Sequence, residues 1–164
     1  MSGKHSKQKG SSFERKVGKE FTDWSGYQWR RSFGSGNSRY AARSLNEHCD
    51  LVCEVETEFI IECKHHADIS YEKMLSGDCS KLNEWIVSLR DDMKRSNKHG
   101  LLVLKTNNKL PYVLFIRKPR RKETVYENQV SQMDSFLKYR CHYVIPLKRF
   151  FQIFKFDNFC QPST

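Results

Sequence analysis

The stretch "HCDLVCEVETEFIIECKHH", residues 48–66, decides the fold of this 164-residue chain. It holds two short runs of strand-forming residues, 50–55 and 58–64, on either side of the charged tip 54–58. This arrangement predicts an antiparallel hairpin. Charged groups stand at the ends of both runs, where burying a carboxylate or an ammonium is costly unless something compensates the charge. These charges therefore either reach water or form a site.

In the second run, residues 58–64, successive side chains are expected to point to alternate faces of a strand. Ile60, Glu62 and Lys64 share one face of a strand, and Cys63 lies on the other. If the hairpin pairs as predicted, Asp50 lies across from the far end of this run, near Glu62 and Lys64. Two carboxylates at that range suit Mg²⁺, which takes one or two carboxylates together with substrate phosphate oxygens. Lys64 can then orient the attacking water or neutralise developing charge. Charges that simply reach water give the same pattern, which also occurs by chance.

Composition bounds the class of protein. Lys and Arg number 29 against 19 Asp and Glu, a formal net charge of +10. Such an excess favours a polyanionic partner, with nucleic acid ahead of an anionic membrane. No long apolar run and no apolar N-terminal segment are present, so we expect a soluble, cytoplasmic protein with no membrane partner.

Cysteine and histidine residues crowd the same hairpin. Without a signal peptide, the six cysteines of the chain are expected to be free thiols. Zinc is an alternative, but structural zinc sites usually draw ligands from tight turns, whereas alternate strand positions point to different faces. A zinc-stabilised binding module is therefore the weaker hypothesis. Its candidate ligands are His48, Cys49, Cys53, Cys63, His65 and His66.

Periodicity along the chain predicts an α/β or α+β domain with a mixed sheet, because helices and strands alternate in blocks. Residues 1–10 are polar and basic, and we expect a flexible arm there. Residues 11–164 then form a single domain, with a core at about 11–118 and a C-terminal extension at about 119–164. The expected helices are 11–25 and 78–96, and the expected strands are 27–33, 50–55, 58–64, 100–106, 111–118 and 142–145.

Four short segments occur in a characteristic order: "SSFERKVGKEF" (11–21), "RRSFGSG" (30–36), "CDLV" (49–52) and "IIECK" (60–64). In this order they resemble the PD-(D/E)XK nuclease superfamily, and within it the archaeal-type Holliday junction resolvases and their phage-encoded relatives. The resemblance implies a restriction-endonuclease-like α/β fold, in which helices flank a central mixed β-sheet.

The resemblance also implies the roles of the site residues. Asp50 and Glu62 would bind the divalent metal with the backbone carbonyl of Cys63, and Glu14 would reach it through water. Lys64 would be the catalytic lysine. Glu14 has a structural alternative, because residues 11–14 also form a capping-box pattern at the start of a helix.

DNA contacts follow from the same resemblance and from the basic charge. Arg side chains suit two-point contacts with phosphate. Ser35 would lie in the loop that approaches the DNA, and Ser32 competes with it for that role. The candidate DNA-binding residues are Arg15, Arg30, Arg31, Ser35, Lys4, Lys7 and Lys9.

The implied activity is that of a Mg²⁺-dependent, structure-selective endodeoxyribonuclease, in which Mn²⁺ can substitute. The expected substrate is a four-way DNA junction, cut by paired symmetric incisions during DNA recombination and repair. A homodimer matches the near two-fold symmetry of such a junction. The alternatives are another PD-(D/E)XK endonuclease that acts on flaps, forks, single strands or duplexes, and a non-catalytic DNA-binding protein.

Overall fold

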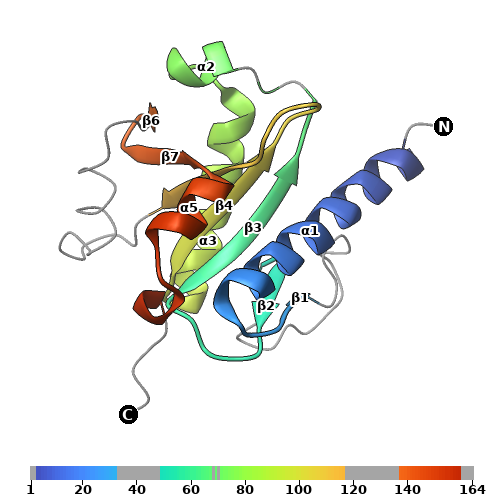
Figure 1. The fold of residues 1–164 in the computed structure, drawn as a ribbon. Helices are drawn as coiled ribbons and strands as arrows, with labels where there is room; N and C mark the ends of the chain where they lie inside the picture. Colours follow the sequence, from blue (N-terminus) through green and yellow to red (C-terminus); the bar gives the residue numbers. More distant parts are fainter. Residues whose placement is uncertain (1–2, 33–48, 68, 70, 117–136, 160–164) are drawn as a thin grey trace.

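The chain folds around one mixed β-sheet with helices on both faces (Figure 1). The computed structural model describes residues 3–32, 49–67, 69, 71–116 and 137–159. Within these residues the sheet has seven strands in the order β1-β2-β3-β4-β5-β7-β6. The strands are β1 (Trp29–Arg31), β2 (Leu51–Cys53), β3 (Phe59–His65), β4 (His99–Lys105), β5 (Tyr112–Ile116), β6 (Leu137–Tyr139) and β7 (His142–Pro146). The helices are α1 (Gly3–Ser25), α2 (Tyr71–Leu75), α3 (Ser80–Ser96), α5 (Leu147–Ile153) and the 3-10 helix η1 (Phe156–Phe159).

The centre of the sheet is the parallel pair β3 and β4. They pair along their whole length, from Phe59 opposite His99 to His65 opposite Lys105. A parallel pair needs a long crossover connection, and α3 lies within that connection. The other strand pairs are antiparallel. The predicted class, a mixed sheet flanked by helices, is confirmed.

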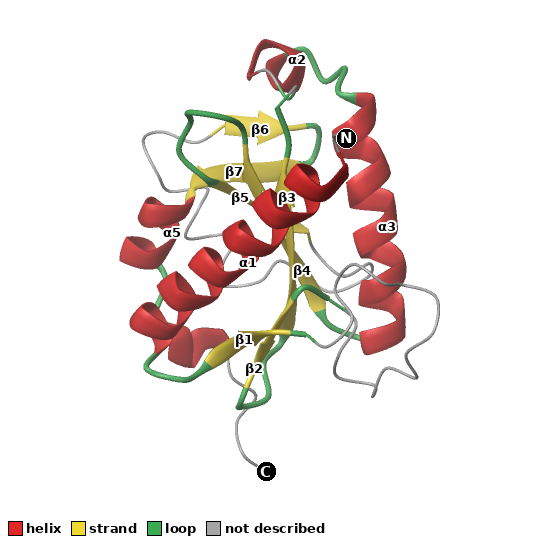
Figure 2. Ribbon diagram, turned by 90° about the vertical axis from the view of Figure 1, so that its right-hand side faces the viewer, coloured by secondary structure: helices red, strands yellow, loops and turns green. Residues whose placement is uncertain are grey.

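Two apolar cores lie on the two faces of the sheet. Figure 2 shows α1 and α5 on one side and α3 on the other. The α1 side buries Ile61 and Cys63 of β3 against Phe21 of α1. The α3 side buries Ile60 of β3 against Leu89 of α3. The alternation expected for β3 is therefore confirmed, and it assigns Glu62 and Lys64 to the α3 side.

The C-terminal segment completes the core on the α1 side. Phe150 of α5 is buried and packs against Phe21 with ring centroids 6.1 Å apart. The indole Nε1 of Trp24 donates a hydrogen bond to the backbone oxygen of Phe154 at 2.9 Å. These contacts join the two ends of the described chain, so residues 147–156 supply packing surface for α1.

The structure corrects the arm expected at residues 1–10, because α1 begins at Gly3. Lys and Gln favour helix, but no apolar side chain between Gly3 and Ser12 marks a buried face there. Periodicity therefore could not reveal these turns. Ser11 lies inside the helix, where its hydroxyl donates to the Gln8 carbonyl oxygen at 3.3 Å. The capping-box interpretation of Glu14 is therefore wrong.

Smaller differences concern short elements. The helix α2 and the strand β6 were not expected, because five and three residues carry too little periodicity to detect. Residues 33–48, between β1 and β2, lie outside the described residues. No helix in the described part of the chain is both long and apolar enough to cross a membrane.

The N-terminal extension of α1 predicts a stabilising substitution. Gly10 lies inside the helix, and a Cβ there would meet only the Glu14 Oε1 atom, at 3.9 Å. Gly10→Ala should raise the free energy of unfolding by about 0.5–1 kcal/mol, because Gly is unfavourable in a helix interior. Urea denaturation measures the change. An unchanged midpoint for Gly10→Ala, together with an unchanged midpoint for Gly10→Pro, would indicate an unstructured arm.

Candidate active site

The site begins where β2 meets β3. Leu51 and Ile61 pair across the two strands. Next to this pair, the backbone N–H of Asp50 donates to the Ile61 oxygen at 3.0 Å. The Asp50 carboxylate then accepts the backbone N–H of Cys63 at 2.9 Å. A side chain thus takes a position that a ladder hydrogen bond would otherwise occupy, and the Asp50 carboxylate is held at the sheet.

Burial and a second carboxylate change the ionisation of Asp50. Its pKa is raised from 3.8 to about 7, first because burial disfavours the charged form and second because Glu62 is negatively charged. Lys64 and the Cys63 N–H act in the opposite direction but do not cancel these effects. Without a further positive charge, the buried carboxylates of the site therefore lower the stability of the folded protein.

Glu62 and Lys64 form an ion pair on the same face of β3. The Lys64 ammonium donates to Glu62 Oε1, with side-chain exposures of 30% and 19%. Burial raises the pKa of Glu62, and Lys64 opposes this shift. Burial alone would lower the pKa of Lys64, but Glu62 and Asp50 together raise it. Lys64 is therefore a cation at neutral pH.

Glu14 of α1 reaches the same region from the other side of the sheet. Its Oε2 atom accepts a hydrogen bond from Arg31 Nε of β1 at 2.5 Å, and the Glu14 side chain is 13% exposed. The charge of Glu14 also contributes to the raised pKa values of Asp50 and Glu62. The structure therefore brings Glu14 within electrostatic range of both carboxylates and joins it to Arg31.

Ser32 lies beside Asp50 at the end of β1. The backbone N–H of Ser32 donates to the backbone carbonyl oxygen of Asp50 at 2.9 Å. Its hydroxyl is buried and has no hydrogen-bond partner among the described residues. Buried hydroxyl groups are normally paired, so this atom favours a ligand or water at the site. Ser35, the alternative loop serine, lies outside the described residues.

The remaining DNA-contact candidates are spread over α1 and β1. Lys9 and Arg15 are exposed on α1, and Arg30 is exposed on β1. Lys4 and Lys7 belong to α1, but the structure does not describe their side chains. The site thus collects the four predicted catalytic residues, while the basic residues around it lie on the neighbouring surface.

Asp92 is a further acid that sequence reasoning missed. It lies on the buried face of α3, is 9% exposed, and accepts a hydrogen bond from Arg95 at 2.5 Å. Its charge contributes to the raised pKa values of Glu62 and Cys49, so it is within electrostatic range of the site. A signal was present, because an acid next to Met93 interrupts the apolar face of the helix.

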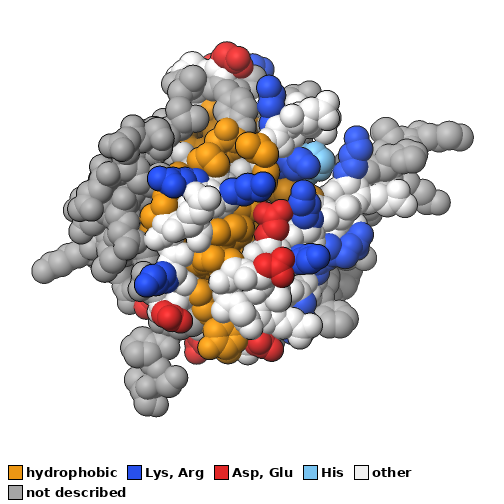
Figure 3. Space-filling model, viewed as in Figure 1, with side chains coloured by type: hydrophobic (Ala, Val, Ile, Leu, Met, Phe, Trp, Pro, Cys, Tyr) orange, Lys and Arg blue, Asp and Glu red, His pale blue; other side chains and the backbone are white. Residues whose placement is uncertain are grey.

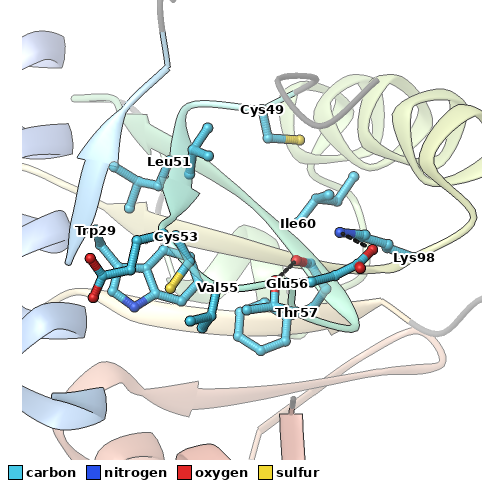
Figure 4. A pocket seen from close by; sticks show the side chains of 12 residues that line it. Trp29, Cys49, Leu51, Cys53, Val55, Glu56, Thr57, Ile60 and Lys98 are labelled. Carbon is cyan, nitrogen blue, oxygen red and sulfur yellow. Dashed lines mark hydrogen bonds and ion pairs between the residues drawn. The ribbon is translucent and has the colours of Figure 1, made fainter. Parts of the chain in front are cut away.

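A cavity of about 290 Å³ lies beside this site, between β2 and the start of β3 (Figure 4). Cys49 and Leu51 are among the side chains that line the cavity. Lys98 and Glu56 also line it and form an ion pair, with Lys98 Nζ 3.6 Å from Glu56 Oε1. Neither Asp50 nor Glu62 is part of this lining. This cavity is therefore separate from the Asp50 and Glu62 carboxylates.

The comparison with protein families gives a match over nearly the whole chain. The family model "Phage putative PDDEXK endonuclease" matches residues 5–159. The chain belongs to this family. Comparisons with curated proteins and with solved structures gave no match. The family match confirms the PD-(D/E)XK resemblance and the restriction-endonuclease-like fold, while the resolvase subtype stays a prediction.

PD-(D/E)XK nucleases generally use divalent metal ions. In the described part of this endonuclease chain, no group of three or more His, Cys, Asp or Glu side chains is arranged to hold a metal by itself. Mg²⁺ does not require such a cage, because water and substrate phosphate complete its shell. Two carboxylates of raised pKa, next to a Ser32 residue whose buried hydroxyl has no partner within the described ranges, fit a hydrated divalent ion.

The two carboxylates predict an unusual pH dependence of stability. The pKa of Asp50 is higher in the folded protein than its ordinary value of 3.8, so the folded state binds the proton more tightly. In EDTA, the free energy of unfolding should therefore fall as pH rises from 5 to 8. Asp50→Asn removes this charge. At pH 8 the melting temperature of the variant should exceed that of the wild type by about 2–4 °C for each kcal/mol of unfolding free energy that is regained.

Asp91→Asn is the matched control, since Asp91 is an exposed carboxyl whose pKa is lowered by its hydrogen bond with Lys94. Asp91→Asn should give no gain in melting temperature at pH 8. Equal melting temperatures for wild type and Asp50→Asn at pH 8 in EDTA would contradict the electrostatic description of the site.

Proposed function

We propose that this endonuclease is a divalent-metal-dependent, structure-selective endodeoxyribonuclease whose ion is held by Asp50 and Glu62. The observation that carries the proposal is the meeting of two part-buried carboxylates of raised pKa with the Lys64 ammonium. A divalent ion supplies the positive charge that these carboxylates need. We expect the ion to be Mg²⁺, with Mn²⁺ able to replace it.

Each residue of the site has a proposed role in phosphodiester hydrolysis. Asp50, Glu62 and the backbone carbonyl of Cys63 are the proposed ligands, and Glu14 acts through water. When bound, the ion polarises the phosphate and lowers the pKa of water. Lys64 can donate to a phosphate oxygen or hold the attacking water, because its ammonium already lies at the carboxylates.

Arg31 couples this chemistry to DNA contact. It is held by Glu14 at 2.5 Å and remains 29% exposed, so part of its guanidinium faces the surface. A guanidinium in this position can contact a phosphate while it fixes the orientation of Glu14. Arg15 and Arg30, both exposed, are proposed to contact flanking phosphates.

The proposed substrate is a four-way DNA junction, as for the resolvases that the sequence resembles. The net charge of +10 supports a DNA partner. A junction requires two opposed incisions, and two copies of the chain about a two-fold axis would supply two such sites. The protein would then act as a homodimer in the cytoplasm of the host cell, in DNA recombination or repair.

Removal of either proposed ligand tests the catalytic assignment. Asp50→Asn and Glu62→Gln should each lower cleavage of a synthetic four-way junction at least about 100-fold, a loss typical of removing one group that stabilises transition-state charge. Junction affinity in EDTA should stay close to the wild-type value. Glu20→Gln on α1 and Asp91→Asn on α3 are controls that should cut normally. Full Mg²⁺-dependent activity in either ligand variant would contradict the assignment.

A substrate panel tests the junction proposal separately. Junction, fork, flap, single strand and duplex, each labelled on every strand in turn, should show paired symmetric cuts in the junction and slower cutting elsewhere. Faster cutting of a flap, fork or duplex would replace the resolvase proposal with another endonuclease activity. Absence of cutting with Mg²⁺ and Mn²⁺ on every substrate would favour the non-catalytic DNA-binding alternative.

A further inference from the structure

A second pocket, lined by basic side chains, lies between the N-terminal half of α1 and the carboxyl ends of β3 and β4. Its volume is about 330 Å³. Helix α1 contributes Lys9, Ser12 and Lys16 to its wall, β3 contributes His65, and β4 contributes Lys105. In Figure 3, Lys and Arg side chains gather around a His side chain over this part of the molecule.

The charged side chains that line the pocket are all positive. Three ammonium groups line it, and its lining contains no carboxylate. Across the described residues, Lys9 and Lys105 form no ion pair with a carboxylate. The nearest carboxylate oxygen to Lys16 is that of Glu20 at 3.9 Å, and the Lys16 side chain is 65% exposed, so this pair is weak. The pocket is therefore suited to an anion.

Neighbouring groups fix the shape of the pocket. The His65 ring lies 5.6 Å from the Phe13 ring, centroid to centroid, and its Nε2 atom is 3.2 Å from Asn107 Oδ1. These two contacts hold the imidazole as one wall. The Ser12 hydroxyl and the lysine ammonium groups can donate hydrogen bonds from the other walls. Several donors around a small volume match the oxygens of a phosphate group.

The position of the pocket relates it to the proposed active site. His65 directly follows Lys64 on β3 and points to the opposite face. From Glu62 to His65 is three steps along the strand, or about 10 Å at the rise of an extended chain. Because Glu62 and His65 lie on opposite faces of β3, a DNA strand that places one phosphate at Asp50 and Glu62 reaches this pocket by passing around the carboxyl end of β3, with the second phosphate a few nucleotides away.

We propose that the pocket binds a phosphate group of the DNA substrate and thereby sets the position of the strand relative to the cut. This inference rests on the proposed function. The phosphate can be an internal phosphodiester or a terminal 5′-phosphate, since both present the same oxygens to lysine and hydroxyl donors. Such a contact adds affinity and register without reading the base sequence.

The test measures DNA affinity in EDTA, where no cleavage occurs. The double variant Lys9→Gln/Lys105→Gln and a matched control, Lys81→Gln/Lys94→Gln, lose the same charge. Both control lysines lie on α3 and are paired with carboxylates, at 2.7 Å and 2.9 Å. Fluorescence anisotropy with a 3′-labelled four-way junction gives the dissociation constant at several salt concentrations.

The pocket variant should bind about tenfold more weakly than the wild type, and the slope of log affinity against log salt should fall by about one, as expected for one lost phosphate contact. The control pair should keep the wild-type affinity and slope. Equal losses in the two pairs would indicate a general charge effect and overturn the inference, as would wild-type binding by the pocket variant. Thermal melts verify folding, and Lys105→Gln alone replaces the double variant if that variant is unfolded.

Two forms of the junction, with 5′-phosphate and 5′-hydroxyl ends, distinguish the source of the phosphate. Tighter wild-type binding of the 5′-phosphate form, lost in the pocket variant, identifies a terminal phosphate. An equal loss for both forms identifies an internal phosphodiester. Because cleavage is absent from the assay, a pocket that binds DNA in a chain that never cuts would keep the phosphate-binding part of this inference while the nuclease proposal fails.

Discussion

The Asp50 carboxylate occupies a place in the sheet that a backbone group normally fills. It accepts the Cys63 N–H at 2.9 Å, and this bond holds a negative charge beside Glu62 rather than in bulk water. Burial and the like charge then raise the pKa of Asp50 to about 7. The single ammonium of Lys64 does not balance two carboxylates, with Glu14 and Asp92 also within electrostatic range. The arrangement is costly for folding and is explained most simply by a cation that binds there.

The sheet separates two regions of opposite charge. Glu62 and Lys64 lie on the α3 side of β3, whereas His65 and the lysines of the second pocket lie on the α1 side. Asp50, Glu14 and Asp92 thus lie within electrostatic range of Glu62 in a chain whose net charge is +10. A polyanionic substrate is attracted by the basic surface, and at Asp50 and Glu62 a metal ion between the carboxylates and the phosphate would offset their repulsion.

The hairpin and the face of each β3 residue could be predicted from the sequence, because a strand has a period of two and Glu62 and Lys64 keep that period. The apolar face of α1 from Phe13 onward could also be predicted from the sequence. The first turns of α1 could not, since their polar residues carry no apolar pattern. The contact between Glu14 and Arg31 depends on how α1 and β1 meet β2, which local patterns do not encode. The same holds for the buried Ser32 hydroxyl, which has no hydrogen-bond partner in the part of the chain that the structure describes. Asp92 was visible only as one polar residue on an apolar helix face.

The proposed chemistry depends on a divalent ion held by Asp50 and Glu62. The most direct measurement is a crystal structure of the protein with Mn²⁺, with anomalous differences recorded at the manganese absorption edge. We expect an anomalous peak bounded by the carboxylate oxygens of Asp50 and Glu62, at about 2.0–2.3 Å from each, the range for metal–oxygen ligand bonds. The same crystals of Asp50→Asn should lack this peak. A peak elsewhere in the protein, or a site left without manganese while the protein cuts DNA with Mn²⁺, would contradict this assignment.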